Sequence, residues 1–235
     1  MMHVLALDTC FGAVSAAVAT VGEAREAHVL AGTFERCATG HAERLMPMVE
    51  AVMREAGLTF RDLGLIAVTH GPGTFTGLRT TVAAARAFAL ATGTPIAAAP
   101  TLGLMALQAS LMLAVPLGTT PITVALDARR GQIWLATLAV ESDWLATDAR
   151  LVTVAEAAEH VRAVGGIVVG SGASLIVAPE AAIGGLSTAL PDLEPDARIL
   201  AAHALRLTPT DRLVPFYLRE PDAKPQVQRA VTTTP

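Results

Sequence analysis

The sequence predicts an α/β fold in which helices pack on mixed sheets that are arranged as two lobes. In the first part of the chain, strand-like and helix-like segments follow in the order β-β-β-α-β-α-β-α, which is typical of helices packed on a mixed sheet. The opening segment then recurs near residue 124, which indicates a second lobe. The chain has 235 residues, of which 52% are hydrophobic and 16% are charged. Such a chain can bury a large apolar core and does not need disulfides to fold.

Three strand-like segments come first. The apolar runs 3–9 and 13–20 are separated by a short turn that contains Gly12, which is typical of a β-hairpin. A third strand is expected over about 26–35. The chain is therefore expected to begin with a hairpin and one more strand.

Helices and strands then alternate up to about residue 113. Between 41 and 56, apolar residues recur at three- and four-residue steps, which predicts a helix, and Gly57 suits its C-terminal cap. The segments that follow are a strand at 64–69, a glycine-rich turn at 70–77, a helix at 77–92, a strand at 95–99 and a helix at 102–113.

The second half repeats the opening of the first. Asp8 ends an apolar strand and Gly12 follows four residues later, and Asp127 and Gly131 have the same spacing after a second apolar strand. An internal duplication explains both copies, while chance likeness between two ordinary hairpins stays open, because Asp at a strand end also caps the backbone. The later segments are a helix near 153–163, a strand near 166–170, a turn at 170–174 and a helix near 197–207.

These segments divide the chain into predicted lobes. We expect an N-terminal lobe over 1–105 and a smaller C-terminal lobe over 106–212. The segment 213–220 is expected to pack back on the first lobe. The tail 221–235 is rich in Pro, Thr and Gln and is expected to be loose.

The charges and cysteines exclude several classes of protein. The net charge of −4 argues against a chain that binds nucleic acid by itself through a basic face. Lys224 is the only lysine, which excludes Schiff-base and Walker-type chemistry from the core. Cys10 and Cys37 fit a reduced compartment better than a disulfide framework. The start has no basic region before its apolar run, and polar residues interrupt the most apolar stretch, 102–117, so we predict a cytoplasmic protein with a buried helix there and no membrane contact.

A glycine-rich segment, GPGTFTGLR at 71–79, is the most informative motif. Glycines permit close backbone approach, and free N–H groups at a helix start favour an anion. A well-capped strand-to-helix turn explains the same residues more simply. The candidate phosphate-loop residues, with those of the two hairpins, are Asp8, Thr9, Gly71, Gly73, Thr74, Thr76, Gly77, Arg79, Asp127 and Arg129.

Metal and hydrolase chemistry find little support. The six histidines form no HExxH or H-x-x-x-H pair, and no G-x-S-x-G elbow occurs. Cys10 has no histidine nearby in the sequence and is interpreted as a structural thiol. Arg129 and Arg130 could meet a phosphate or an acidic partner, or form a solvated turn. We therefore predict no catalytic residues and no metal site.

The two predicted helices at 41–56 and 77–92 suggest a protein interface. The first carries Met46, Met48 and Met53, which give an adaptable apolar surface, and the second is lined with small residues. Either both faces are buried within the monomer or one face binds another protein.

Several motifs in order resemble the TsaB (YeaZ) family of bacterial proteins. The segment at 71–79 is similar to the family signature GPG-[ST]-FTG-[LV]-R. Four further segments resemble family motifs, namely LALDT at 5–9, HAERLMP at 41–47, DARRGQIW at 127–134 and PFYLR at 215–219. The chain departs from the family pattern in having Gln132 where Glu is usual, and in a second lobe that is short.

The resemblance implies a two-lobed, actin-like fold of the sugar kinase/Hsp70/actin class, RNase H-like, with a degenerate second lobe. It implies a non-catalytic subunit for synthesis of N6-threonylcarbamoyladenosine (t6A) in tRNA. Such a subunit would pair with TsaD and also with TsaE, would have a functional link to TsaC, and would form a homodimer when alone. The metal-binding H-x-x-x-H pair of TsaD has only His41 here, with Leu45 at the other position.

The resemblance also implies where partners and ligands bind. The partner or dimer interface would use the two helices, and the residues expected there are Leu45, Met48, Val49, Val52, Met53, Val82, Ala85, Phe88 and Ala89. tRNA would be bound only through the complex. No cofactor is assigned to this chain, and ATP or ADP at a subunit interface stays open.

Two other hypotheses remain beside the scaffold. An actin-like ATPase or kinase would use Asp8, Asp127 and the loop Gly71–Gly77 around a phosphate, although neither hairpin turn is glycine-rich. A metallopeptidase is the weakest, since a catalytic zinc site needs three protein ligands.

Overall fold

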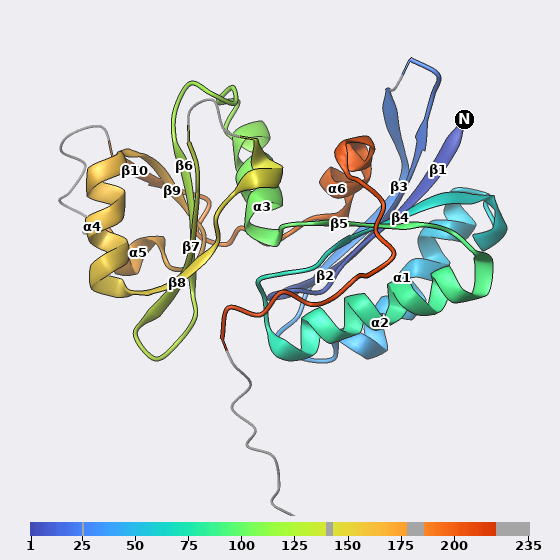
Figure 1. Cartoon of the computed structure of the whole chain (residues 1–235), viewed down its shortest axis with the longest axis horizontal. Coiled ribbons are helices and arrows are strands. Elements are labelled where there is room, and N and C mark those ends of the chain that lie inside the picture. Colours follow the sequence, from blue (N-terminus) through green and yellow to red (C-terminus); the bar gives the residue numbers. More distant parts are fainter. Residues whose placement is uncertain (25, 140–142, 178–185, 220–235) are drawn as a thin grey trace, which may run out of the picture.

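The computed structural model describes the chain except for residues 25, 140–142, 178–185 and 220–235. Two five-stranded mixed sheets form the two lobes seen side by side in Figure 1. The predicted α/β class and actin-like fold are therefore confirmed. The predicted tail, 221–235, lies outside the described residues.

The first sheet is built from the predicted N-terminal strands. Its strand order is β3-β2-β1-β4-β5, with β1, β2 and β3 antiparallel and with β4 and β5 parallel to β1. The strands are β1 Met2–Asp8, β2 Ala13–Val21, β3 Ala27–Arg36, β4 Leu63–Thr69 and β5 Ile96–Ala99. Because β1 and β4 lie inside the sheet and are covered on both faces, they are continuous apolar runs rather than alternating ones.

The second sheet repeats the topology of the first. Its strand order is β10-β9-β6-β7-β8, again with an antiparallel hairpin and two parallel strands beside it. The strands are β6 Ile122–Asp127, β7 Gln132–Leu138, β8 Arg150–Thr153, β9 Gly166–Val169 and β10 Leu186–Ala189. The two Asp-x-x-x-Gly motifs therefore hold equivalent places, at the β1–β2 and β6–β7 turns. The sequence analysis missed β8 and β10, which are short and half-exposed.

The helices lie where the sequence predicts them, except for one short helix at the end of the turn expected at 170–174, which the sequence analysis missed. They are α1 His41–Glu55, α2 Phe75–Thr92, α3 Thr101–Met112, α4 Val154–Val164, α5 Ala173–Ile176 and α6 Ala197–His203. Three short 3₁₀ turns are η1 Phe60–Asp62, η2 Trp144–Ala146 and η3 Ala204–Arg206. The helix expected over 197–207 is wrong in length, because α6 ends at His203 and η3 follows. α2 begins earlier than expected, because Thr74 caps it: the Thr74 hydroxyl accepts from the Gly77 N–H.

The elements form five layers, which Figure 1 shows from the side. Helices α1 and α2 cover the outer face of the first sheet, and α4 and α5 cover the outer face of the second. Helices α3 and α6 lie between the sheets, where one apolar core contains residues of both lobes. Helix α6 falls in the range predicted for the second lobe, yet it packs on β1, β2 and β3 of the first sheet.

The most apolar part of the sequence forms α3. Its residues from Thr101 to Ser110 are all buried, as expected for a helix between two sheets. In the part of the chain that the structure covers, no helix combines the length and the apolar character needed to cross a membrane.

The segment after η3 returns to the first lobe. Pro209 forms a bridge with Ala97 of β5, and the Thr210 N–H donates to the Ile96 carbonyl at 2.8 Å. Leu213 is buried in the core beneath α2, and the Phe216 N–H donates to the His70 carbonyl at 2.7 Å. Residues 209–217 therefore run along the first lobe and end beside the glycine-rich loop.

Candidate functional site

The glycine-rich loop is packed tightly against its neighbours. A Cβ atom on Gly77 would lie 1.9 Å from the Thr9 carbonyl oxygen, and one on Gly71 would lie 2.3 Å from the Phe216 carbonyl oxygen. Gly71 also has a φ of 129°, which side chains rarely adopt. These glycines are thus explained by close backbone approach, as in the simpler interpretation of a capped turn.

Asp8 and Thr9 belong to the interior. The Thr69 hydroxyl donates to Asp8 Oδ1 at 2.5 Å, and the Cys10 N–H donates to the same carboxylate at 3.2 Å. Burial raises the pKa of Asp8 to about 7, against the lowering effect of these hydrogen bonds. The Thr9 hydroxyl donates to the Gly77 carbonyl and lies 2.6 Å from the Thr81 hydroxyl. Asp8 therefore joins the end of β1 to the end of β4, and Thr9 joins the β1–β2 turn to α2; neither side chain lines the cleft between the lobes.

Four of the other candidate residues, Thr74, Thr76, Asp127 and Arg129, border a cleft between the lobes, and Gly71, Gly73, Gly77 and Arg79 do not. This cleft has a volume of about 660 Å³. Its walls come from the β1–β2 turn, the starts of α1 and α2 and the β6–β7 turn, and include Gly12, His41, Glu43, Thr74, Thr76, Asp127, Arg129 and Glu194. The structure thus brings Thr74, Thr76, Asp127 and Arg129 together and leaves Asp8 outside.

Carboxylates hold both hairpin turns at this cleft. Asp127 accepts from the Arg129 N–H at 2.8 Å and from its guanidinium at 3.0 Å. Glu194, which lies 182 residues from Gly12, accepts from the Gly12 N–H at 2.9 Å. Burial raises the pKa of Glu194. The sequence analysis missed Glu194, because no local pattern marks a contact of such separation.

A second hollow lies between α1 and α2. This helix groove has a volume of about 610 Å³ and a mostly apolar lining. Met46 and Phe75 are each 41% exposed in it. The lining residues are Ala42, Leu45, Met46, Phe75, Thr76, Arg79, Thr80, Ala83, Ala84 and Ala87, of which Arg79 alone is charged.

Most residues expected at the partner interface lie in the core of the chain itself. Buried between the two helices and the first sheet are Leu45, Met48, Val49, Val52, Met53, Val82 and Ala85. Phe88 and Ala89 are half-buried, and Phe88 stacks on Phe60 at 4.9 Å between ring centroids. The physical reason is that one apolar helix face has the same periodicity whether a sheet or a partner covers it. The exposed faces carry Met46, Ala83 and Ala87 instead.

The histidines and acidic residues are scattered. Within the described ranges, no group of three or more His, Cys, Asp or Glu side chains is placed to hold a metal ion. His41, from the motif of the first helix, is buried with its Nε2 atom 2.7 Å from the Phe11 carbonyl oxygen. The prediction that the chain has no metal site remains a prediction.

The sequence of this chain matches a family model and a relative of similar length. The model described as TsaD, tRNA N6-adenosine threonylcarbamoyltransferase, matches residues 34–168. An uncharacterised protein of Mycobacterium tuberculosis strain H37Rv is 35% identical over 228 residues, which are 94% of each chain.

Two further relatives carry more informative names. The tRNA threonylcarbamoyladenosine biosynthesis protein TsaB of Escherichia coli K12 is 34% identical over 135 residues, which are 57% of this chain and 54% of that protein. The match therefore spans about half of the E. coli protein. The structure of YeaZ from Pseudomonas aeruginosa superposes with a TM-score of 0.75 at 25% identity, over 93% of this chain and 100% of that chain.

Proposed function

The chain belongs to the TsaB (YeaZ) family, and we propose that it is the non-catalytic scaffold and activating subunit of the complex that makes t6A in tRNA. Its place in t6A biosynthesis follows from its relatives. The finer proposal is that it pairs with TsaD, that TsaE joins the pair, and that TsaC supplies the activated threonylcarbamoyl group. The chain alone would form a homodimer through the same surface, in the cytoplasm.

The observation that carries this proposal is the helix groove between α1 and α2. The groove is open and apolar, and Arg79 is the single charged residue among the described residues that line it. Exposed apolar surface of this kind is typical of a protein interface. Since this chain itself matches the TsaD model, TsaD is expected to present a related helix pair. Two related helix pairs can pack about a pseudo-twofold axis, as two copies of one chain do.

The cleft between the lobes supports an accessory role. Asp8, which an ATPase or kinase would direct at a phosphate, is buried and bonded to Thr69. The N–H of Gly12, in the turn that would contact the phosphate, already donates to Glu194. We therefore assign ATP chemistry and the transfer reaction on tRNA to the assembled complex rather than to a catalytic site within this chain.

Ala83→Arg tests the interface directly. Ala83 is exposed in the groove, so arginine there would place a charge in an apolar contact, and we expect affinity for TsaD to fall at least tenfold. Ala91→Arg is the matched control, since Ala91 is exposed on α2 outside the groove. Isothermal titration measures the affinities, and equal affinity for Ala83→Arg and the control would refute the interface.

Reconstitution tests the role. TsaC, TsaD and TsaE from one organism are incubated with tRNA, ATP, threonine and bicarbonate, with and without this chain, and modified nucleoside is measured by mass spectrometry. We expect product only in the presence of the chain. Equal product without it would refute the activating role.

A further inference from the structure

A continuous set of arginine and aromatic side chains links the two lobes. We define the arginine face as Arg129, Arg130 and Arg219, with Trp134 and Tyr217 among them. We propose that this face binds the phosphate backbone of an RNA strand, an inference that rests on the proposed function and assigns part of the RNA surface to this chain.

The second lobe supplies the β6–β7 turn. The Gln132 N–H donates to the Arg129 carbonyl at 3.1 Å, and Gln132 Oε1 accepts from the Arg219 guanidinium at 2.5 Å. Arg219 also lies 6.0 Å from the centroid of the Trp134 ring. Contact therefore runs without a break from the turn to the C-terminal segment.

The first lobe supports this face through the start of α2, where Phe75 and Arg79 line the helix groove. The Phe75 and Tyr217 rings are 5.5 Å apart, and the Arg79 guanidinium lies 3.7 Å from the centroid of Phe75. Arg79 also donates to the Tyr217 hydroxyl at 3.2 Å. These contacts hold the Tyr217 ring in place at the edge of the arginine face, which lowers the entropy lost when the ring stacks on a base.

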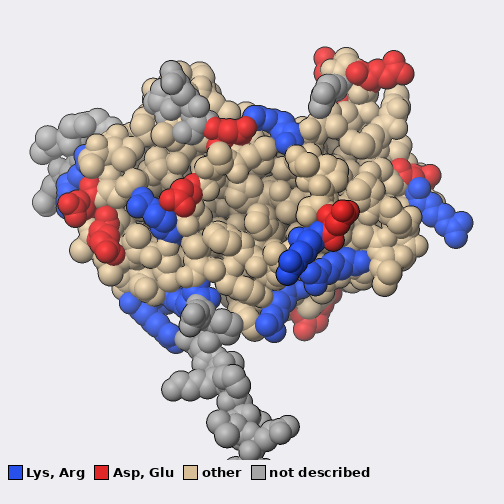
Figure 2. Space-filling view, in the orientation of Figure 1, with Lys and Arg blue, Asp and Glu red and all other residues tan. Residues whose placement is uncertain are grey.

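The face is positive although the chain carries a net charge of −4. Among the described residues that form these contacts, Asp127 is the one carboxylate, and it pairs with Arg129. Gln132 bonds to Arg219 without supplying a negative charge, so the charge of Arg219 is not neutralised by this contact. In Figure 2, basic side chains lie in two groups at the lower edge of the molecule, and acidic side chains lie beside the group on the right.

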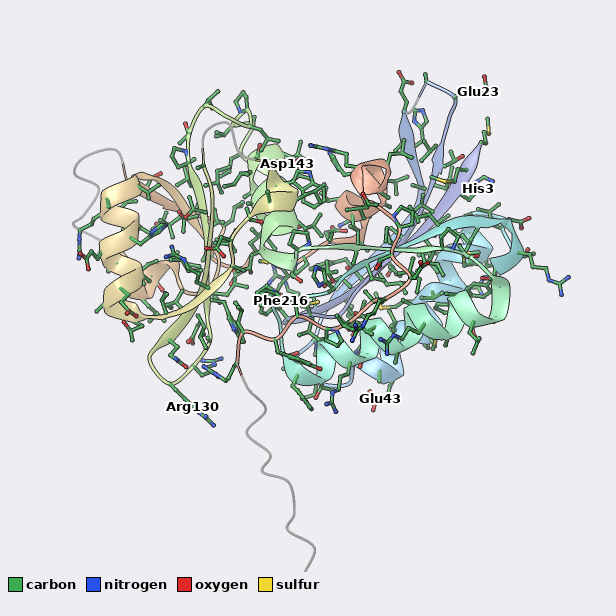
Figure 3. All side chains as sticks on the ribbon, in the orientation of Figure 1. His3, Glu23, Glu43, Arg130, Asp143 and Phe216 are labelled. Atoms are coloured by element: carbon green, nitrogen blue, oxygen red, sulfur yellow. The ribbon has the colours of Figure 1, made fainter. Side chains whose placement is uncertain are left out.

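The turn itself favours a binding role for its arginines. Arg129 and Arg130 have φ angles of 63° and 59°, a conformation in which Asn, Asp and Gly are preferred. Local backbone preference therefore does not explain arginine at these positions. The Arg129 side chain is 86% exposed, and Arg130 points away from the body at the tip of the hairpin in Figure 3.

The mixture of charge and rings favours RNA over an acidic protein segment. Guanidinium groups pair with phosphates, and aromatic rings accept unpaired bases by stacking. Trp134 lies with Arg129 in the lining of the cleft between the lobes, and Tyr217 is half-buried two residues before Arg219. An acidic protein would use the same charges but would gain less from the flat rings.

The test uses the complex with TsaD and a tRNA transcript, whose affinity is measured by fluorescence anisotropy over a salt series. Gln132→Glu keeps the hydrogen bond and adds a charge that neutralises Arg219, so we expect RNA affinity about threefold weaker. The double variant Arg129→Glu/Arg219→Glu should weaken it at least tenfold and lower the slope of affinity against salt by about two. Arg162→Glu, on α4 and exposed, is the control that should change neither.

The affinity of each variant for TsaD is titrated separately. Normal pairing with weakened RNA binding supports the inference, and normal pairing with unchanged RNA binding overturns it while leaving the proposed function intact. Weakened pairing with unchanged RNA binding would assign the face to a protein partner and also overturn it. If the unmodified chain fails to pair with TsaD, the proposed function itself fails.

Discussion

The pKa of Asp8 shows how burial changes the ionisation of a carboxyl group. Asp8 ends β1 and is completely buried. The groups that donate hydrogen bonds to its carboxylate, the Thr69 hydroxyl and the Cys10 N–H, are neutral. Desolvation disfavours the charged form, which places the pKa at about 7 against an ordinary value of 3.8. Asp8 is therefore protonated in the folded chain over a pH range in which it is ionised in the unfolded chain.

This difference makes stability depend on pH. Between about pH 4 and pH 7 the folded state holds a proton that the unfolded state releases, so the free energy of unfolding should fall as pH rises. The loss attributable to Asp8 is at most roughly 4 kcal/mol. Asp8→Asn should flatten this dependence, which urea unfolding at a series of pH values measures. Identical slopes for the two proteins would show that Asp8 is ionised in the folded state.

At the residue scale, the sequence predicts where a residue lies in a strand, turn or helix better than it predicts which distant residues surround its side chain. The sequence analysis identified Asp8 at a strand end, but the hydroxyl that hydrogen-bonds its carboxylate belongs to Thr69, 61 residues away. The contact between Glu194 and Gly12 depends on how the whole chain folds, so no local pattern could predict it. The capped turn at Thr74 was predictable, because its partner lies three residues on.

At the scale of elements, α3 is the clearest case of a helix shaped by its neighbours. It is apolar all round because sheets lie on both sides of it, and the sequence alone predicts such burial from the missing polar face. For α1 and α2 the periodicity predicts helices and an apolar face, but it cannot distinguish the sheet that covers the face from a partner.

Leu104→Ala tests the packing of α3. Leu104 is completely buried in the core shared by the two sheets, so we expect the free energy of unfolding to fall by about 2–5 kcal/mol through lost burial and a cavity. Leu111→Ala on the same helix is the control, since Leu111 is 50% exposed and should cost under about 1 kcal/mol. Equal losses for the two variants in urea unfolding would contradict the layer arrangement.

At the scale of the whole molecule, the layer that contains α3 and α6 joins the two sheets, which share no paired strands among the described residues. One core contains residues of both sheets together with α3 and α6, so loss of either lobe would expose apolar surface of the other. We expect a single cooperative transition. Tryptophan fluorescence reports the contact between the lobes, since Trp134 packs against Phe11 and Trp144 lies in the shared core, while far-UV circular dichroism reports the helices and sheets of both lobes. The two midpoints in urea should coincide, and separate midpoints would show that the lobes unfold independently.

The topology of the first lobe was more predictable than that of the second. Strong periodicity and capping residues mark β1 to α3, and nearly every expected boundary lies within two residues of the observed one. In the second lobe, β8 and β10 have four residues each and no clear alternation of burial, so pairing with neighbours rather than local pattern makes them strands.

The path of residues 209–217 has a consequence for solubility. An edge strand presents unpaired backbone groups that can recruit a strand of another molecule. Beside the edge strand β5, the segment 209–217 of the same chain occupies the place that a strand of another molecule could take. Pro209 has no N–H with which to extend the hydrogen bonding of the sheet. At the opposite edge, β3 carries Glu35 and Arg36, and the β2–β3 register shifts between Val18 and Ala19. Both edges of the first sheet are thus protected against intermolecular β-pairing, by a proline at one and by charge and an irregular strand at the other.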